Sequence, residues 1–154
     1  MSPHEGAAPP RPPLRVIVVD DSGIFREGLV SLLRAAGIDV VEALASTDGL
    51  GAALLLRRPD AAVLDVRLPP TSTDEGVQAA VATRRSCPDC GILLLSTYAE
   101  ASWMRRLTDR IPHGVGYLLK DRVADVHRLI EALGIVAAGG IAIDSAIVEG
   151  ALSE

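Results

Sequence analysis

Five residues with reactive side chains each follow or end a short apolar run in this sequence. They are Asp20, Asp21, Asp65, Ser96 and Lys120. Carboxylates can hold a divalent cation, and one of them can act as a nucleophile toward phosphorus. A hydroxyl and an ammonium group can bind the oxygens of a phosphoryl group. Together these residue types indicate a site that accepts or binds a phosphoryl group.

The apolar runs before these residues have the length and composition of buried β-strands. Between them, apolar residues recur at spacings of three and four, which is typical of amphipathic helices. We predict strands over residues 14–19, 40–44, 61–64, 92–95 and 115–119, and helices over 24–36, 48–57, 74–85, 99–110 and 123–138. Strict alternation of strand and helix predicts a doubly wound, flavodoxin-like (CheY-like) α/β fold. Its five-stranded parallel sheet has the order 2-1-3-4-5, with helices on both faces.

In such a fold the first and third strands are neighbours, and ligands bind beyond the carboxyl ends of the strands. Asp20, Asp21 and Asp65 would then meet at one edge of the sheet. Three close carboxylates repel one another unless a cation neutralises them, and an all-oxygen pocket suits Mg²⁺. A strand-end aspartate is often only a helix cap, and Lys120 beside Asp121 could be a surface ion pair. The functional interpretation is favoured because all five groups follow strands that share one edge.

Composition bounds the class of protein. The chain has 154 residues, of which 49% are hydrophobic, and this fits one compact domain. A formal charge of −5 argues against nucleic-acid binding by bulk electrostatics. The sequence has no signal-type apolar core, no membrane-spanning stretch and only two cysteines, so we predict a cytoplasmic protein. We expect a disordered proline-rich arm at 1–13, the domain at 14–138, and a linker with a short helix at 139–154.

Several segments carry a family resemblance. Over residues 14–138 the chain resembles a response-regulator receiver domain of two-component signalling, on the segments VIVVDDS, LDVRLPP, LLLST and GYLLKD. Three further segments resemble LuxR/NarL-type transcriptional regulators, especially actinobacterial ones: TDEGVQAA, GYLLKDRV and GGIAIDSAIVEGAL. In that subfamily a DNA-binding helix-turn-helix follows the tail. None follows Glu154 here, so we expect a receiver without its effector domain, and DNA binding only through a domain that is not in this chain.

The resemblance implies roles for the strand-end residues. Asp65 would accept a phosphoryl group from a sensor histidine kinase. Asp21 would bind Mg²⁺ or Mn²⁺ directly and Asp20 through water, with Asp65 and the backbone carbonyl of Arg67 completing the metal site. Ser96 and Lys120 would bind the phosphoryl group.

The resemblance also implies a switch. Tyr117 matches the switch aromatic, which turns inward as Ser96 moves toward the phosphate, and Arg67 and Tyr98 occupy positions that tune hydrolysis of the acyl phosphate. The switching face would be formed by the fourth helix, fifth strand and fifth helix. We expect a weak or phosphorylation-dependent homodimer that controls an effector output, with transcription the favoured one. The protein would be a regulator with self-directed phosphotransfer and autodephosphorylation, not a metabolic enzyme.

Two segments depart from the family pattern. Residues 111–116 replace the common Gly-Ala before the fifth strand, and Pro70 with residues 71–73 lengthens the loop after Asp65. The first departure bears on the mobility of the loop before the fifth strand. The second bears on access to the phosphorylation site.

Two other functions fit part of the pattern. A haloacid-dehalogenase-type phosphohydrolase uses similar groups, but its nucleophile lies on the first strand and its acidic pair comes last, whereas here the pair comes first. A receiver that is never phosphorylated and acts only as an interaction module is the other alternative. Retention of all five groups argues against it.

The remaining conspicuous residues favour structural interpretations. Cys87 and Cys90 have the spacing of a redox pair or of half a zinc site, but no second pair completes a tetrahedron. Trp103 would pack in the core, or anchor an interface if exposed. The histidines at positions 4, 113 and 127 are scattered, with no catalytic partner at a fixed spacing.

Overall fold

The computed structural model describes residues 12–68, 75–98 and 101–152. Most of the expected proline-rich arm and the residues from Pro70 to Thr73 lie outside this part of the chain, as does His4. The side chain of Trp103 is also outside the described part, so the expectation for it stays a prediction.

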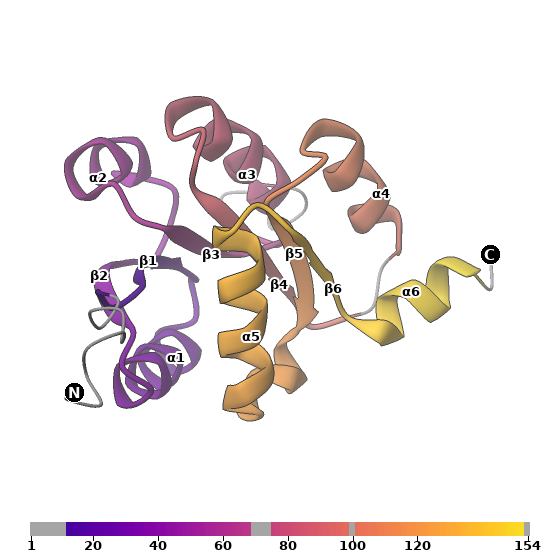
Figure 1. The fold of residues 1–154 in the computed structure, drawn as a ribbon, viewed down its shortest axis with the longest axis horizontal. Helices are drawn as coiled ribbons and strands as arrows, with labels where there is room; N and C mark the ends of the chain where they lie inside the picture. The colour runs from indigo at the N-terminus through magenta and orange to yellow at the C-terminus, as the bar shows by residue number, and fades with distance from the viewer. Residues whose placement is uncertain (1–11, 69–74, 99–100, 153–154) are drawn as a thin grey trace, which may run out of the picture.

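Six parallel strands form one sheet in the order β2-β1-β3-β4-β5-β6 (Figure 1). They are β1 (Arg15–Val19), β2 (Asp39–Leu44), β3 (Ala61–Asp65), β4 (Gly91–Ser96), β5 (Val115–Leu119) and β6 (Ile141–Ile143). Every pairing between neighbours is parallel. The predicted order of the first five strands is therefore confirmed. All residues of β3 and β4 are buried, which explains why these strands are continuously apolar instead of alternating.

Helices cover both faces of the sheet. They are α1 (Gly23–Ala35), α2 (Leu50–Arg57), α3 (Glu75–Ser86), α4 (Ala101–Arg110), α5 (Val126–Ala137) and α6 (Ser145–Leu152), with a 3-10 turn η1 (Lys120–Ala124) before α5. Side chains of α1 and α5 share one buried cluster with the sheet. Side chains of α2, α3, α4 and α6 share the cluster on the opposite face. The core is thus two apolar layers separated by the sheet.

Side-chain caps set the beginnings of two helices. Ser22 precedes α1, and its hydroxyl accepts a hydrogen bond from the backbone N–H of Phe25 at 3.3 Å. Asp125 does the same for α5 by accepting from the N–H of Arg128 at 3.4 Å. Because Asp125 has an extended backbone and starts a new helix, the helix predicted over 123–138 is divided into η1 and α5.

The tail contains a strand that was not predicted. After Gly139, whose φ of 92° lies in the left-handed region, residues 141–143 pair with β5 and extend the sheet. A strand of three residues is too short to show the periodicity by which strands are predicted. The short helix expected in the tail is present as α6.

None of the helices in the described residues has both the length and the apolar composition needed to cross a membrane.

Candidate functional site

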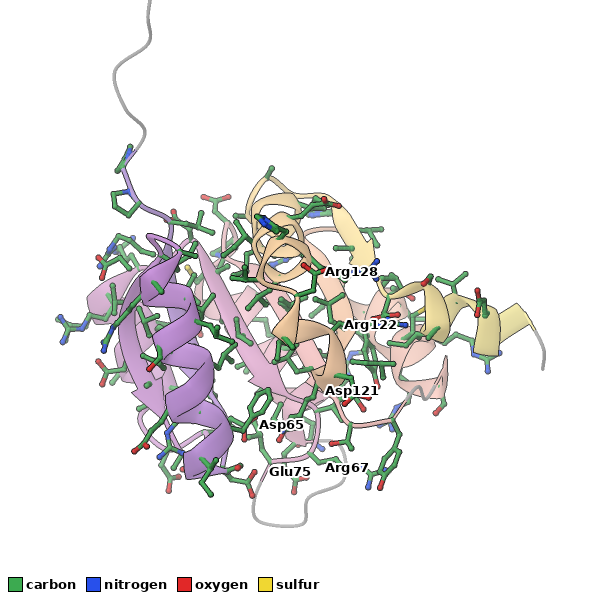
Figure 2. All side chains as sticks on the ribbon, turned by 90° about the horizontal axis from the view of Figure 1, so that it is seen from below. Asp65, Arg67, Glu75, Asp121, Arg122 and Arg128 are labelled. Carbon is green, nitrogen blue, oxygen red and sulfur yellow. The ribbon has the colours of Figure 1, made fainter. Side chains whose placement is uncertain are left out.

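Three carboxylates meet where β1 and β3 end, because these strands are neighbours in the sheet. Asp20 and Asp21 follow β1 and Asp65 ends β3, and one oxygen of each lies within 4.8 Å of the others. Asp20 and Asp65 are only 2% and 7% exposed, whereas Asp21 is exposed. Figure 2 shows Asp65 at one end of the molecule, near Arg67 and Glu75. The predicted convergence of the three aspartates is therefore observed.

Lys120, directly after β5, joins this cluster. Its Nζ lies 2.9 Å from Oδ2 of Asp20 and 3.0 Å from Oδ2 of Asp65. Burial disfavours the charged amine, but the hydrogen bonds and negative charges of the two aspartates outweigh it and raise the pKa of Lys120. Burial raises the pKa of Asp65, and it exceeds the opposing effects of the Arg67 N–H and of Lys120. The charges of Asp20, Asp65 and Lys120 thus influence one another.

Backbone hydrogen bonds hold the second oxygen of each buried carboxylate. The N–H of Ser22 donates to Oδ1 of Asp20 at 2.9 Å, and the N–H of Arg67 donates to Oδ1 of Asp65 at 3.0 Å. One oxygen is therefore fixed by the chain that follows the strand, while the other faces Lys120. This arrangement orients both side chains toward the same point.

Ser96 ends β4 and is buried, but its hydroxyl bonds to the loop that follows. Its Oγ donates to the carbonyl of Tyr98 at 2.8 Å and accepts from the Tyr98 N–H at 3.2 Å. Tyr98 is 62% exposed, and the Arg67 guanidinium lies 5.7 Å from the centroid of its ring. The two residues expected to tune hydrolysis thus contact each other, and the Ser96 hydroxyl is engaged with the Tyr98 backbone.

Tyr117 lies in β5 with its side chain completely buried. It belongs to the core cluster that also contains Leu107 of α4 and Ile147 of α6. The structure therefore places the expected switch aromatic in the inward position.

The family model of the response regulator receiver domain matches residues 16–133. The chain belongs to this family. The match includes the ends of β1 and β3, where the acidic cluster lies. It also includes Lys120 and most of α5.

Relatives of this receiver domain include curated transcriptional regulators. The transcriptional activator DevR/DosR of Mycobacterium tuberculosis is 37% identical over 110 residues, which is 70% of this chain and 48% of that protein. LnrK of Bacillus subtilis is 28% identical over 143 residues, covering 92% of this chain and 61% of that one. The chain spans about half to three fifths of the length of these two relatives.

Solved structures agree with the fold of this receiver domain. The receiver domain of NarL from M. tuberculosis has a TM-score of 0.66 and 28% identity, covering 80% of this chain and 98% of that one. A LuxR-family response regulator from Aurantimonas has a TM-score of 0.73 and 24% identity, covering 91% and 99%. The NarL receiver domain is thus a relative of this one, and the Aurantimonas structure has the same fold.

The receiver site includes contacts that the sequence pattern did not reveal. The Phe25 ring lies 4.4 Å from Lys120 Nζ, in cation–π range. Arg26 donates from Nη1 to the carbonyl of Asp20 at 2.7 Å. Helical periodicity identified α1 but could not indicate that its first turn touches the site. Gly76 is a third case, because a Cβ there would lie 2.1 Å from the carbonyl oxygen of Asp65. Only glycine lets α3 approach the end of β3 so closely.

The cysteine pair lies at the opposite, amino-terminal edge of the sheet. Cys87 and Cys90 are free thiols in the turn between α3 and β4. Burial, followed by the neighbouring Cys87, raises the pKa of Cys90 to about 12. Cys90 is therefore a protonated core residue, which agrees with the structural interpretation.

The donor set of the receiver site fits a divalent metal. Asp20, Asp21 and Asp65 supply only oxygen ligands, within the spacing that one ion can bridge. Mg²⁺ and Mn²⁺ prefer such ligands, and both retain water in partly exposed sites. The exposure of Asp21 leaves one side of the cluster open to solvent.

Proposed function

We propose that this receiver domain accepts a phosphoryl group on Asp65 from the phosphohistidine of a sensor kinase. The observation that carries the proposal is the buried Asp65 carboxylate, held 3.0 Å from Lys120 and beside two further aspartates. A carboxylate fixed in this way has one oxygen anchored by the Arg67 N–H and the other directed at the point where a phosphoryl group would enter.

The transfer exchanges one bond to phosphorus for another. An oxygen of ionised Asp65 forms the new P–O bond while the P–N bond to the kinase histidine breaks. The electron pair of the broken bond stays on the imidazole nitrogen, which takes up a proton. Lys120 pairs with an oxygen of the transferred group, and Ser96 donates a hydrogen bond to another after leaving the Tyr98 carbonyl.

Asp20, Asp21 and Asp65, with the backbone carbonyl of Arg67, would hold Mg²⁺ or Mn²⁺. When bound, such an ion offsets the negative charge that the carboxylates and the phosphoryl group bring together. Lys120 alone cannot neutralise three carboxylates and an incoming phosphoryl group.

The expected output is control of an effector, with transcription the favoured one. Phosphorylation would shift a pre-existing equilibrium between two conformations and would promote homodimerisation. Ser96 would be the group that moves, while Tyr117 already has the inward position. Arg67 and Tyr98 would set the lifetime of the acyl phosphate by shielding it from water. The curated relatives support this output because their names describe transcriptional regulators. Contact with DNA would need a helix-turn-helix domain, and the site of action would be the cytoplasm.

Intact mass after incubation with Mg²⁺ and acetyl phosphate tests the proposal. We expect one phosphoryl adduct on the wild type and none on Asp65→Asn. Asp89→Asn is the matched control, since it makes the same change at an exposed position before β4 and should still gain the adduct. If no small donor or phosphorylated kinase produced an adduct, the alternative of an interaction module without phosphorylation would replace this proposal.

A further inference from the structure

The last strand and helix of the chain cover the side of the molecule formed by β5 and α4. β6 pairs with β5 from Val115 and Ile141 to Tyr117 and Ile143. α6 then packs against α4, and Ile147 is fully buried in the same cluster as Tyr117. Figure 1 shows β6 at the end of the sheet and α6 beside α4. We call residues 141–152 the C-terminal latch.

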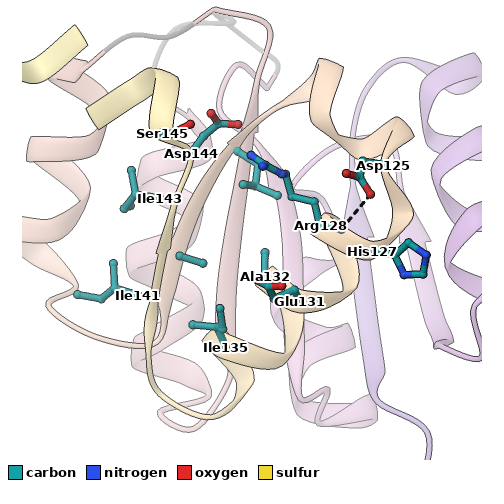
Figure 3. Close-up of a pocket in the computed structure, with 12 residues that line it drawn as sticks. Asp125, His127, Arg128, Glu131, Ala132, Ile135, Ile141, Ile143, Asp144 and Ser145 are labelled. Carbon is teal, nitrogen blue, oxygen red and sulfur yellow. Dashed lines mark hydrogen bonds between the residues drawn. The ribbon is translucent and has the colours of Figure 1, made fainter. Parts of the chain in front are cut away.

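The C-terminal latch is weakly anchored. Among its residues whose side chains the structure describes, Asp144 and Ile147 are the buried ones. On its other side, β6 and α5 border an open groove lined by Arg128, Glu131 and Ile141 (Figure 3). So few buried side chains make a segment that can detach without unfolding the domain.

Asp144 connects the strand and the helix of the C-terminal latch. Its N–H donates to the Tyr117 carbonyl at 2.8 Å, which closes the β5–β6 pairing. Its Oδ1 accepts from the N–H of Ala146 at 3.0 Å, and its carbonyl accepts from the N–H groups of Ile147 at 3.0 Å and Val148 at 3.2 Å. One residue therefore ends β6 and begins α6.

The buried Asp144 carboxylate depends on Arg122. The Arg122 Nε lies 3.4 Å from Oδ2, and the Asp144 side chain is completely buried while Arg122 is 44% exposed. Among the described residues, Arg122 is the one cation within ion-pair distance of Asp144. A buried carboxylate that loses its counter-charge is strongly unfavourable, so displacement of Arg122 would loosen the latch.

Arg122 belongs to the same 3-10 turn as Lys120. This turn, η1, spans Lys120–Ala124, and Lys120 at its start bridges Asp20 and Asp65. Figure 2 shows Asp121 and Arg122 on the ribbon between the end carrying Asp65 and the tail. The single turn η1 therefore connects the acidic cluster, through Lys120, to Asp144 of the C-terminal latch, through Arg122.

We infer that phosphorylation of Asp65 releases the C-terminal latch through η1. The inference rests on the proposed function. A phosphoryl group on Asp65 would take the place of the carboxylate oxygen as the partner of Lys120, and the lysine would follow it. Because Lys120 and Arg122 are two residues apart in η1, a shift of the Lys120 backbone also moves Arg122 and breaks its 3.4 Å ion pair with Asp144. The C-terminal latch then leaves α4 and β5, and the surface of α4 and β5 that it covered becomes exposed to solvent.

Amide hydrogen exchange of residues 141–152 tests the inference, in samples with and without acetyl phosphate and Mg²⁺ and with the extent of phosphorylation measured by intact mass. Phosphorylation should speed exchange in the latch by roughly tenfold, and Asp65→Asn should show no response. Arg122→Gln should speed exchange without any phosphoryl donor. Arg128→Gln is its matched control, because it removes the same charge beside β6 but no ion pair to Asp144.

Two results would overturn the inference. One is unchanged latch exchange in a sample that is fully phosphorylated. The other is latch protection that rises with protein concentration, since the segment would then be exchanged between two copies. Failure of the proposed function is distinguishable from both, because it shows as a missing adduct, while Arg122→Gln still reports on the latch.

Discussion

Two basic side chains lie at opposite edges of the sheet and have opposite kinds of partner. At the carboxyl edge, Lys120 contacts the carboxylates of Asp20 and Asp65. At the amino edge, Arg84 donates to three backbone carbonyls, those of Cys90 at 3.2 Å, His113 at 2.7 Å and Gly114 at 2.7 Å. The first edge therefore concentrates charge, whereas the second uses one charge to satisfy neutral acceptors.

The difference follows from the chemistry of the two cations. The planar guanidinium has several donors in a fixed arrangement, which suits carbonyls that the chain holds in place. The ammonium group is a compact charge on a flexible stem, so it can follow a negative group that moves. Lys120 is the one lysine among fifteen basic residues. The arginine edge therefore holds fixed backbone acceptors, whereas the lysine edge is chemically suited to a charged group that moves.

Replacing Lys120 should have the largest effect on stability. Lys120→Met leaves buried carboxylates without their counter-charge and should lower the free energy of unfolding by about 3 kcal/mol, measured by urea denaturation at neutral pH. Mg²⁺ should restore part of the loss, because the remaining aspartates can bind it. If Lys120→Met were as stable as the wild type without metal, the contrast between the two edges would be wrong.

The stabilisation that Lys120 provides depends on pH. Because the pKa of Lys120 is raised in the fold, its contribution is fully present below the ordinary lysine pKa of about 10.4. The contribution is lost as pH rises through the raised value. Wild type and Lys120→Met should therefore converge in stability at strongly alkaline pH.

Replacing Arg84 should have an intermediate effect. Arg84→Met removes donors from three carbonyls and should cost about 2 kcal/mol of stability, with no response to Mg²⁺. Arg84→Lys should recover only part of this, since one ammonium group cannot meet three fixed acceptors. The neighbouring exposed Arg85→Met is the control and should change the urea midpoint little.

Replacing Asp65 should have the smallest effect on stability, and it should stabilise the fold instead of destabilising it. The pKa of Asp65 is raised, so the stability linked to its protonated form is present at low pH and lost as pH rises through the raised value. Asp65→Asn should therefore be more stable than the wild type at pH 7, by less than the Arg84→Met substitution costs. The gain should shrink as the solution is acidified. A loss of stability at pH 7 would show that the ion pair with Lys120 outweighs burial.

Much of the fold and the site could be predicted from local patterns. Strand order and the meeting of Asp20, Asp21 and Asp65 follow from where apolar runs end, because parallel strands bring their carboxyl ends to one edge. The contacts of Phe25 and Arg26 could not be predicted, since helical periodicity does not say what the first turn of a helix touches.

Local sequence patterns are enough to predict the order of the elements and the residues at each strand end, because both depend on short-range periodicity. Three features depend on long-range packing: residues 141–143 form a strand, Arg84 donates to carbonyls of two loops, and Arg122 pairs with Asp144. A three-residue strand has no stability without β5 beside it. The partners of the two arginines are set by how distant segments pack, which no local pattern encodes.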